Sequence, residues 1–181
     1  MILMELKSFM NAENELFVQS TLRSLPELDE LDHRILAVLQ QDASMTNLDL
    51  SKQVLASPPT CLRRVRRLEE LGVIQRRVAI LDPGVFGANL TAIVEIMLEH
   101  QGSEQQAAFE ARMRDEPAVL QCYRVSPGPD FVLVVQTADM PAYHRLSQRL
   151  FAAGSNVRNV RAFFSINRSK FDTRVVRPEA E

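Results

Sequence analysis

Apolar residues recur at helical spacing in the first part of the chain. From residue 28 to residue 39 they fall on one stripe, which predicts an amphipathic helix with this stripe against a core. Asp29 and Asp32 resemble its N-cap and an acidic first turn. A pattern like a capping box at residues 46–49 predicts a short second helix. The residues predicted to face the core are Leu28, Leu31, Ile35, Leu36 and Leu39, followed by Leu50 and Val54.

A third helix is predicted over residues 58–71. Ser57 is a good N-cap, Pro58 fits the first helical position, and Gly72 suits the left-handed conformation that ends many helices. The next residues, 73–80, predict β-structure. The three helices and this β-structure make a winged helix-turn-helix. A helical wheel of the third helix places Cys61, Val65 and Leu68 on one face and Thr60, Arg63 and Arg67 on the other.

The second half of the chain alternates strand-like and helical patterns. A Ser103–Gln106 capping box and Asp139 each predict a helix start, and residues 131–137 are apolar on both faces, as in a strand covered on both sides. The order β-α-β-β-α-β predicts a ferredoxin-like antiparallel sheet with two helices on one face, so the fold class is α+β. The predicted strands are residues 89–98, 119–125, 131–137 and 157–166, and the predicted helices are residues 103–114 and those after residue 139.

The patterns divide the chain into five segments. The segments are an extension of unassigned role (1–24), the winged helix-turn-helix (25–82), a linker (83–88), the ferredoxin-like domain (89–167) and a polar tail expected to be partly disordered (168–181).

A sheet with helices on one face must also hide its other face. The apolar side chains on that second face predict a homodimer, with a monomer as the alternative. These side chains are Ile93, Met97, Tyr123, Val132, Val134 and Phe163.

Positive charge is concentrated in one place on a chain of net charge −2. Six arginines lie between Arg63 and Arg77, against Glu69 and Glu70. A local cationic patch on the outer face of a capped helix is typical of a duplex-DNA reader, while a solvated helix with Arg–Glu pairs is the ordinary alternative. We expect Thr60 and Arg63 to contact bases. The helix start at Ser57 favours phosphate, and phosphate contacts are also expected for Arg64, Arg66, Arg67, Arg76 and Arg77.

The segment that contains the three predicted helices resembles the DNA-binding domain of the Lrp/AsnC (feast/famine) bacterial transcription regulators. The resemblance covers about residues 25–170, so it implies that the second domain is a RAM/ACT-like effector and oligomerisation domain. It also implies a homodimer, which in many members assembles further into octamers. One departure is Leu55, which stands where the family usually has glycine in the turn before the third helix, and a remodelled turn is expected. The matching residues are Ser57, Pro58, Cys61, Leu62, Arg64, Val65, Arg67, Leu68, Glu69, Gly72 and Ile74.

The loop at residues 124–131 is the second candidate site. In the resembled family it lines a pocket for small effectors, often amino acids, with a glycine three residues before an aspartate. Here Asp130 matches the aspartate, but Gly128 is two residues before it and lies between prolines. Asp130 could pair with an effector ammonium, and backbone N–H groups near Ser126 and Gly128 could bind its carboxylate. A plain hairpin turn is the alternative.

Other chemistry has little support. Cys61 and Cys122 are isolated in predicted core segments, so neither a metal site nor a disulfide is expected, and no cofactor is predicted. No apolar run is long enough to span a membrane, and a cytoplasmic location is expected. Two other functions stay open. One is an effector-independent architectural DNA-binding protein; the other is an enzyme like the sirohaem decarboxylases, which share this architecture and for which His100 and His144 could contact the tetrapyrrole.

Overall fold

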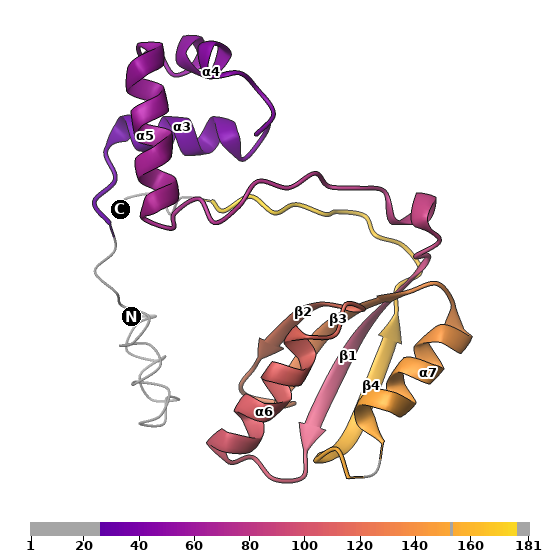
Figure 1. Ribbon diagram of the computed structural model, residues 1–181. Helices are drawn as coiled ribbons and strands as arrows, with labels where there is room; N and C mark the ends of the chain where they lie inside the picture. The colour runs from indigo at the N-terminus through magenta and orange to yellow at the C-terminus, as the bar shows by residue number, and fades with distance from the viewer. Residues whose placement is uncertain (1–25, 153, 177–181) are drawn as a thin grey trace. The chain divides into compact units, whose positions relative to one another are not determined.

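The computed structural model describes residues 26–152 and 154–176 (Figure 1). The described chain forms two compact units. One runs to Val78 and also contains the segment from Asp172 onward, and the other is Ala79–Phe171. The expectation for residues 1–24 and the end of the predicted tail, residues 177–181, lie outside the described residues.

The first unit contains the three predicted helices, α3 (Glu30–Leu39), α4 (Asn47–Gln53) and α5 (Pro58–Glu70). Each begins at the predicted N-cap, because a side-chain oxygen of Asp29, Thr46 or Ser57 accepts a hydrogen bond from a backbone N–H of the first turn. Asp29 and Asp32 form a complete capping box. Local side-chain chemistry therefore determines where all three helices start.

The core of this unit lies between the three helices. Its fully buried apolar side chains come from every helix and from the predicted inward faces. Leu62 and Leu71, at the edges of the apolar face of α5, are about half exposed. The apolar face of α5 is thus held against α3 and α4, which leaves its other side for charged residues. The buried residues are Ile35, Leu50, Val54, Cys61, Val65 and Leu68.

The predicted β-structure at residues 73–80 is wrong, because this segment contains no strand. After Gly72, the amides of Val73 and Ile74 bond to the carbonyl of Leu68 and so close the end of α5, and Val78 and Ile80 are exposed. A strand needs a neighbouring strand to satisfy its N–H and C=O groups, and within the described residues this segment has none. The pattern of apolar residues alone could not supply that partner.

The described part of the tail is not free. The backbone N–H of Val175 donates to Oε1 of Gln40 at 2.6 Å, and Nε2 of Gln40 donates back to the carbonyl of Val175 at 3.3 Å. One amide side chain therefore pairs with one residue of the extended tail much as a neighbouring strand would. The structure describes residues 168–176 in an extended conformation without regular secondary structure, and the partial disorder expected for residues 168–181 stays a prediction.

The second unit is one four-stranded sheet with two helices. The strand order β2-β3-β1-β4, with every neighbouring pair antiparallel, confirms the predicted ferredoxin-like fold. A short 3₁₀ helix, η1 (Pro83–Phe86), precedes the sheet where a linker was predicted. The elements are β1 (Leu90–Leu98), α6 (Ser103–Arg114), β2 (Val119–Arg124), β3 (Phe131–Thr137), α7 (Met140–Phe151) and β4 (Val157–Phe164).

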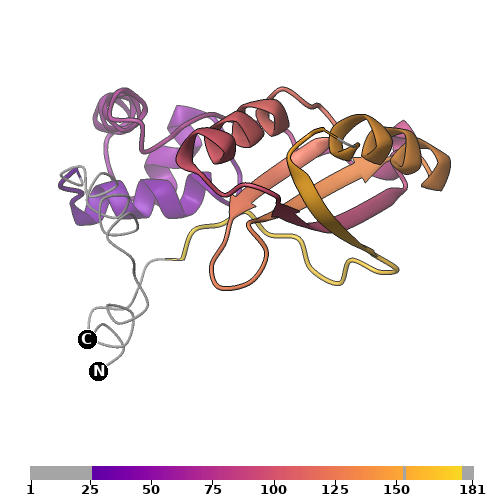
Figure 2. The ribbon, with the colours of Figure 1, turned by 90° about the horizontal axis from the view of Figure 1, so that it is seen from below.

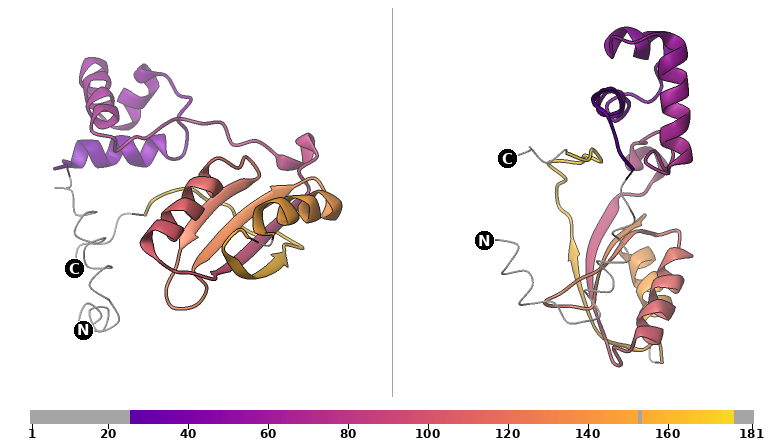
Figure 3. Two further views of the ribbon diagram at one scale, coloured as in Figure 1. Left: turned by 60° about the horizontal axis from the view of Figure 1, so that its bottom comes forward. Right: turned by 90° about the vertical axis from the view of Figure 1, so that its left-hand side faces the viewer.

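Both helices of this unit pack on the same face of the sheet (Figures 2 and 3). Side chains alternate along β3, so Phe131, Leu133 and Val135 are buried under the helices, while Val132 and Val134 on the opposite face are only partly buried. That opposite face also exposes Ile93, Tyr123 and Phe163 by about half. Within the described residues of this unit, the helices therefore cover one face of β3.

The predicted capping box at the start of α6 is wrong. Gly102 is the N-cap, no side chain caps this end, and Ser103 is already the first helical residue. By contrast, the prediction for α7 is confirmed, since Oδ1 of Asp139 accepts from the amide of Ala142 at 2.7 Å. The predicted and the observed N-cap of α6 thus differ by one residue, whereas those of α7 are the same.

Candidate nucleic-acid interface

The start of α5 is tied down by hydroxyl and amide side chains. Oγ of Ser57 accepts from the amide of Thr60 at 3.3 Å, and the two hydroxyl oxygens lie 2.8 Å apart. The Nδ2 group of Asn47 donates to the carbonyl of Pro58 at 2.8 Å and so connects the first turns of α4 and α5. These bonds fix the direction of the helix N-terminus, the end that favours an anion such as phosphate.

The six predicted DNA-binding arginines divide into two groups. Arg63, Arg66 and Arg76 are exposed, and none of them has a carboxylate partner within 4.0 Å among the residues that the structure describes. The other three, Arg64, Arg67 and Arg77, form ion pairs inside the unit. Nη2 of Arg77 lies 2.7 Å from Glu69. All six were predicted to bind DNA, whereas among the described residues the structure leaves three of them exposed and without a carboxylate partner.

Arg64 and Arg67 converge on one carboxylate. Asp32 is completely buried, and its Oδ2 lies 3.2 Å from Nη1 of Arg64 and 3.0 Å from Nη1 of Arg67. Arg64 also lies 2.7 Å from Oδ2 of Asp29, and Arg67 donates to the carbonyl of Glu27 at 3.0 Å. The group connects the start of α3 to the middle of α5.

The sequence pattern indicates only a capping role for Asp29 and Asp32. The hydrogen bond from the amide of Asp32 is the main reason that the pKa of the Asp29 carboxyl lies below its usual value. The positive charge of Arg64 lowers this pKa further. A signal was present in the sequence: two acids three apart on one helix and two arginines three apart on another can face each other. Which faces meet is decided only when the helices pack.

The turn between α4 and α5 keeps the conformation that normally requires glycine. Leu55 has φ 53°, and the amides of Leu55 and Ala56 bond to the carbonyls of Lys52 and Ser51. This is the Schellman arrangement, which also ends α5 at Gly72 with φ 70°. The expectation of a remodelled turn is wrong, because leucine takes the left-handed position and its side chain is 84% exposed.

The predicted effector residues share one loop in the second unit. The backbone of Asp130 pairs with Ile96 and Val125, and its Oδ2 accepts from the amide of Leu98 at 2.7 Å. Ser126 and Gly128 are exposed, and Gly128 has φ 127°. Asp130 therefore fixes the loop to the end of β1, so one of its two carboxylate oxygens already has a partner.

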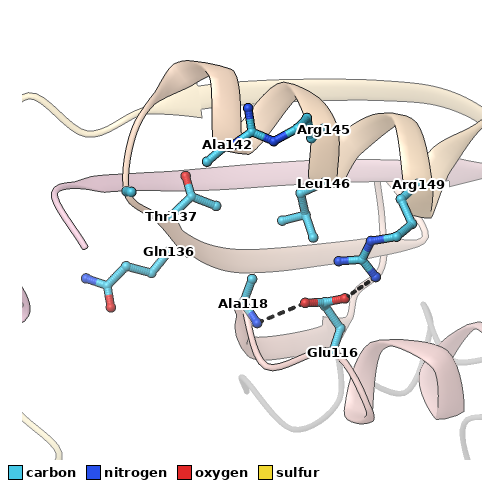
Figure 4. A pocket seen from close by; sticks show the side chains of 9 residues that line it. Glu116, Ala118, Gln136, Thr137, Ala142, Arg145, Leu146 and Arg149 are labelled. Carbon is cyan, nitrogen blue, oxygen red and sulfur yellow. Dashed lines mark hydrogen bonds and ion pairs between the residues drawn. The ribbon is translucent and has the colours of Figure 1, made fainter. Parts of the chain in front are cut away.

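A cleft of about 490 Å³ lies at the other end of β3 (Figure 4). Its one buried charge is Glu116, which accepts from Arg149 at 2.6 Å and from the amide of Ala118 at 3.2 Å. The hydrogen bond from Arg149 is the main reason that the pKa of Glu116 is lowered. No sequence pattern pointed to this cleft, and two of its charged groups, Glu116 and Arg149, bind each other. The lining residues are Glu116, Ala118, Gln136, Thr137, Ala138, Ala142, Arg145, Leu146 and Arg149.

The residues considered for other chemistry lie apart from these sites. Cys61 is in the core and Cys122 is partly buried on β2, and both are free thiols whose pKa is raised by burial. His100 and His144 are exposed, and the side chain of Asn156 bonds to both the N–H and the carbonyl of His100. Within residues 26–152 and 154–176, no helix has the length and apolar character needed to cross a membrane.

Comparison with protein families gives two matches. A family described as "Winged helix-turn-helix DNA-binding" matches residues 28–75, and one described as "Lrp/AsnC ligand binding domain" matches residues 91–175. The first contains α3, α4 and α5. The second contains all of the sheet except Leu90, the first residue of β1.

Relatives are similar to this chain over most of their length. The chain is 38% identical to an uncharacterized HTH-type transcriptional regulator of Haemophilus influenzae, over 82% of this chain and 89% of the relative. It is 35% identical to the leucine-responsive regulatory protein of Salmonella typhimurium, over 88% of this chain and 97% of the relative. These relatives are transcriptional regulators, which points to a non-enzymatic role.

Solved structures agree with the sequence relatives. A transcriptional regulator from Neisseria meningitidis in complex with L-Met superposes with a TM-score of 0.77 at 29% identity, covering 83% of this chain and 97% of that one. An AsnC family regulator from Agrobacterium tumefaciens has the same TM-score at 34% identity, covering 82% and 97%.

Proposed function

The chain belongs to the Lrp/AsnC family of DNA-binding transcriptional regulators, and from this premise we propose that α5 contacts bases through Thr60 and Arg63. Arg66 and Arg76 would bind phosphate, as would the amides at the start of α5 near Ser57. The observation that carries the proposal is that Arg63, Arg66 and Arg76 are exposed and free of carboxylates within the described residues. Arg64, Arg67 and Arg77 are left out of this set because carboxylates of the unit hold them.

The test is duplex binding measured by fluorescence anisotropy across a salt series. The two duplexes are the region upstream of the protein's own gene and a scrambled control. A preference of ~10³-fold or more, weakening steeply with salt, supports a specific regulator. Equal, salt-sensitive binding to both duplexes would favour an architectural DNA-binding protein instead.

Two arginine variants separate base contact from phosphate contact. Arg63→Ala is expected to cost ~1–3 kcal/mol on the preferred duplex and to reduce the preference, whereas Arg76→Ala is expected to weaken both duplexes alike. Arg145→Ala on α7 is the matched control, since it removes an exposed arginine from the other unit. If Arg63→Ala and Arg145→Ala behaved identically, the placement of α5 against bases would be refuted.

We also propose that the second unit binds an amino acid through Ser126, Gly128 and Asp130. Support comes from the matched ligand-binding family and from two related proteins, a regulator in complex with L-Met and leucine-responsive regulators. Calorimetric titration with L-leucine and L-methionine tests binding, and Asp130→Ala should abolish the heat. Glu116→Gln is the control at the separate cleft; loss of binding in that variant alone would move the site there.

We propose further that the open face of the sheet joins two copies. The support is the half-exposed apolar group Ile93, Tyr123 and Phe163 on the face of the sheet opposite α6 and α7. A dimer would present two copies of α5 to half-sites about one DNA turn apart, and dimers could assemble further. Sedimentation velocity should show dimers or larger species for the parent and monomers for Ile93→Lys, with the exposed Val85→Lys as control. We also propose a cytoplasmic location, and the DNA-binding role supports it.

A further inference from the structure

Two of the six arginines, Arg64 and Arg67, are directed at one buried carboxylate. Asp32 has no exposed surface, yet both Arg64 and Arg67 place Nη1 within 3.2 Å of its Oδ2. The side chains of Arg64 and Arg67 are 23% and 39% exposed. Both guanidinium groups are thus partly desolvated and directed at α3.

This arrangement is stable for a simple electrostatic reason. A buried carboxylate must be paired, and removal of its partners leaves an uncompensated charge in a medium of low dielectric constant. The attraction of Asp32 therefore holds both arginines even when a phosphate is near, because a phosphate would have to replace a buried partner. Arg64 has a second carboxylate at 2.7 Å in Asp29, whereas Asp32 is the carboxylate partner of Arg67 among the described residues.

We propose that Asp32 is a specificity-determining residue, because it withdraws Arg64 and Arg67 from phosphate contact. Each phosphate neutralised by a protein cation adds affinity for every duplex, whatever its sequence. Holding two cations back lowers this sequence-independent affinity and leaves discrimination to Thr60 and Arg63. The inference rests on the proposed function of α5 and deepens it.

The readout is the slope of log Kobs against log salt concentration, which steepens by ~0.9 for each phosphate contacted. For full-length Asp32→Asn on the scrambled duplex, we expect tighter binding and a slope steeper by roughly 0.9, because Arg67 is released while Asp29 keeps Arg64. The double variant Asp29→Asn, Asp32→Asn should add roughly 0.9 more. Asparagine at position 29 preserves the N-cap. The preference for the upstream duplex should fall in both variants.

A merely structural role for Asp32 predicts the opposite result. Loosening of α5 would weaken binding to both duplexes, with a slope equal to that of the parent or shallower, and this outcome would overturn the inference. If parent binding is absent, the proposed function fails and the inference fails with it. Normal parent binding combined with an unchanged slope in both variants overturns the inference alone.

A third variant keeps the test decisive if the aspartate variants fail to fold. Asp32→Asn combined with Arg64→Gln and Arg67→Gln replaces the charged group by neutral amides, so that no unpaired charge is buried. Its slope should equal that of the parent, because neither arginine contacts phosphate in the parent. A slope shallower by roughly 1.8 would show that both arginines do contact DNA, and would overturn the inference.

Discussion

Leu55 is the place where the fold of the first unit can be made more stable. Its φ of 53° puts a branched side chain in the left-handed region, which costs roughly 1–2 kcal/mol for a residue with a Cβ. Leu55→Gly removes that cost, but glycine gives the unfolded chain more freedom, worth about 0.4–1 kcal/mol. Because the side chain is 84% exposed, the burial lost on its removal is small, ~0.3 kcal/mol. The net expectation is a gain of ~0.5 kcal/mol.

Differential scanning calorimetry of the whole chain measures this change as a shift in Tm of the first unit. A gain of ~0.5 kcal/mol corresponds to about 2–4 °C in a domain of this size. Leu55→Ala is the matched variant, because it removes the same side chain but keeps the Cβ, and it should lower stability slightly. The comparison of glycine with alanine therefore isolates the backbone term.

The converse substitution, from glycine to a residue with a Cβ, is made in the other Schellman turn. Gly72 has φ 70° and open space where a Cβ would stand, so Gly72→Ala introduces strain without a clash. It should lower stability by ~0.5–1 kcal/mol. If Leu55→Gly were no more stable than Leu55→Ala, or if Gly72→Ala were neutral, the argument from the left-handed conformation would be refuted.

Three further predictions concern the second unit. The folded pKa of Glu116 lies below its ordinary value of 4.5 because Arg149 donates a hydrogen bond to its carboxylate. The contribution of Glu116 to stability is therefore present above pH 4.5 and is lost as the pH falls below that value. The stability difference between the parent and Glu116→Gln, measured by urea unfolding at pH 7 and pH 3, should shrink at pH 3. Asp139→Ala should cost about 1 kcal/mol by removing the cap of α7, and an equal loss in Asp139→Asn, which can still cap, would argue against this cause. Leu133→Ala, at a fully buried position, should cost about 2–5 kcal/mol, against less than about 0.5 kcal/mol for Val85→Ala at an exposed one, both measured by urea unfolding.

Features that depend on neighbouring residues followed from the sequence alone. The starts of α3, α4, α5 and α7 were predicted because a cap is a hydrogen bond over three residues. The buried faces of the helices followed from periodicity, since a side chain's face depends only on its position along a regular element. The order of the strands in the sheet followed from the β-α-β-β-α-β order of the elements along the chain. The range of α6 was also predicted, but its cap was assigned to Ser103 and not to Gly102, because glycine and serine are both acceptable N-caps and the pattern does not choose between them.

Features that depend on which surfaces meet required the tertiary structure. Arg63 and Arg64 are neighbours of one type in the sequence, but only Arg64 faces the buried carboxylate of Asp32 when α5 packs on α3. Likewise, the apolar residues after Gly72 could not reveal whether a second strand would pair with them. The sequence by itself determined a winged-helix-type domain with one local cationic patch, followed by a ferredoxin-like sheet. Only the packing decided which of its charges are free to bind a partner, because electrostatic pairing acts between residues far apart in the chain and falls off within a few ångströms in space.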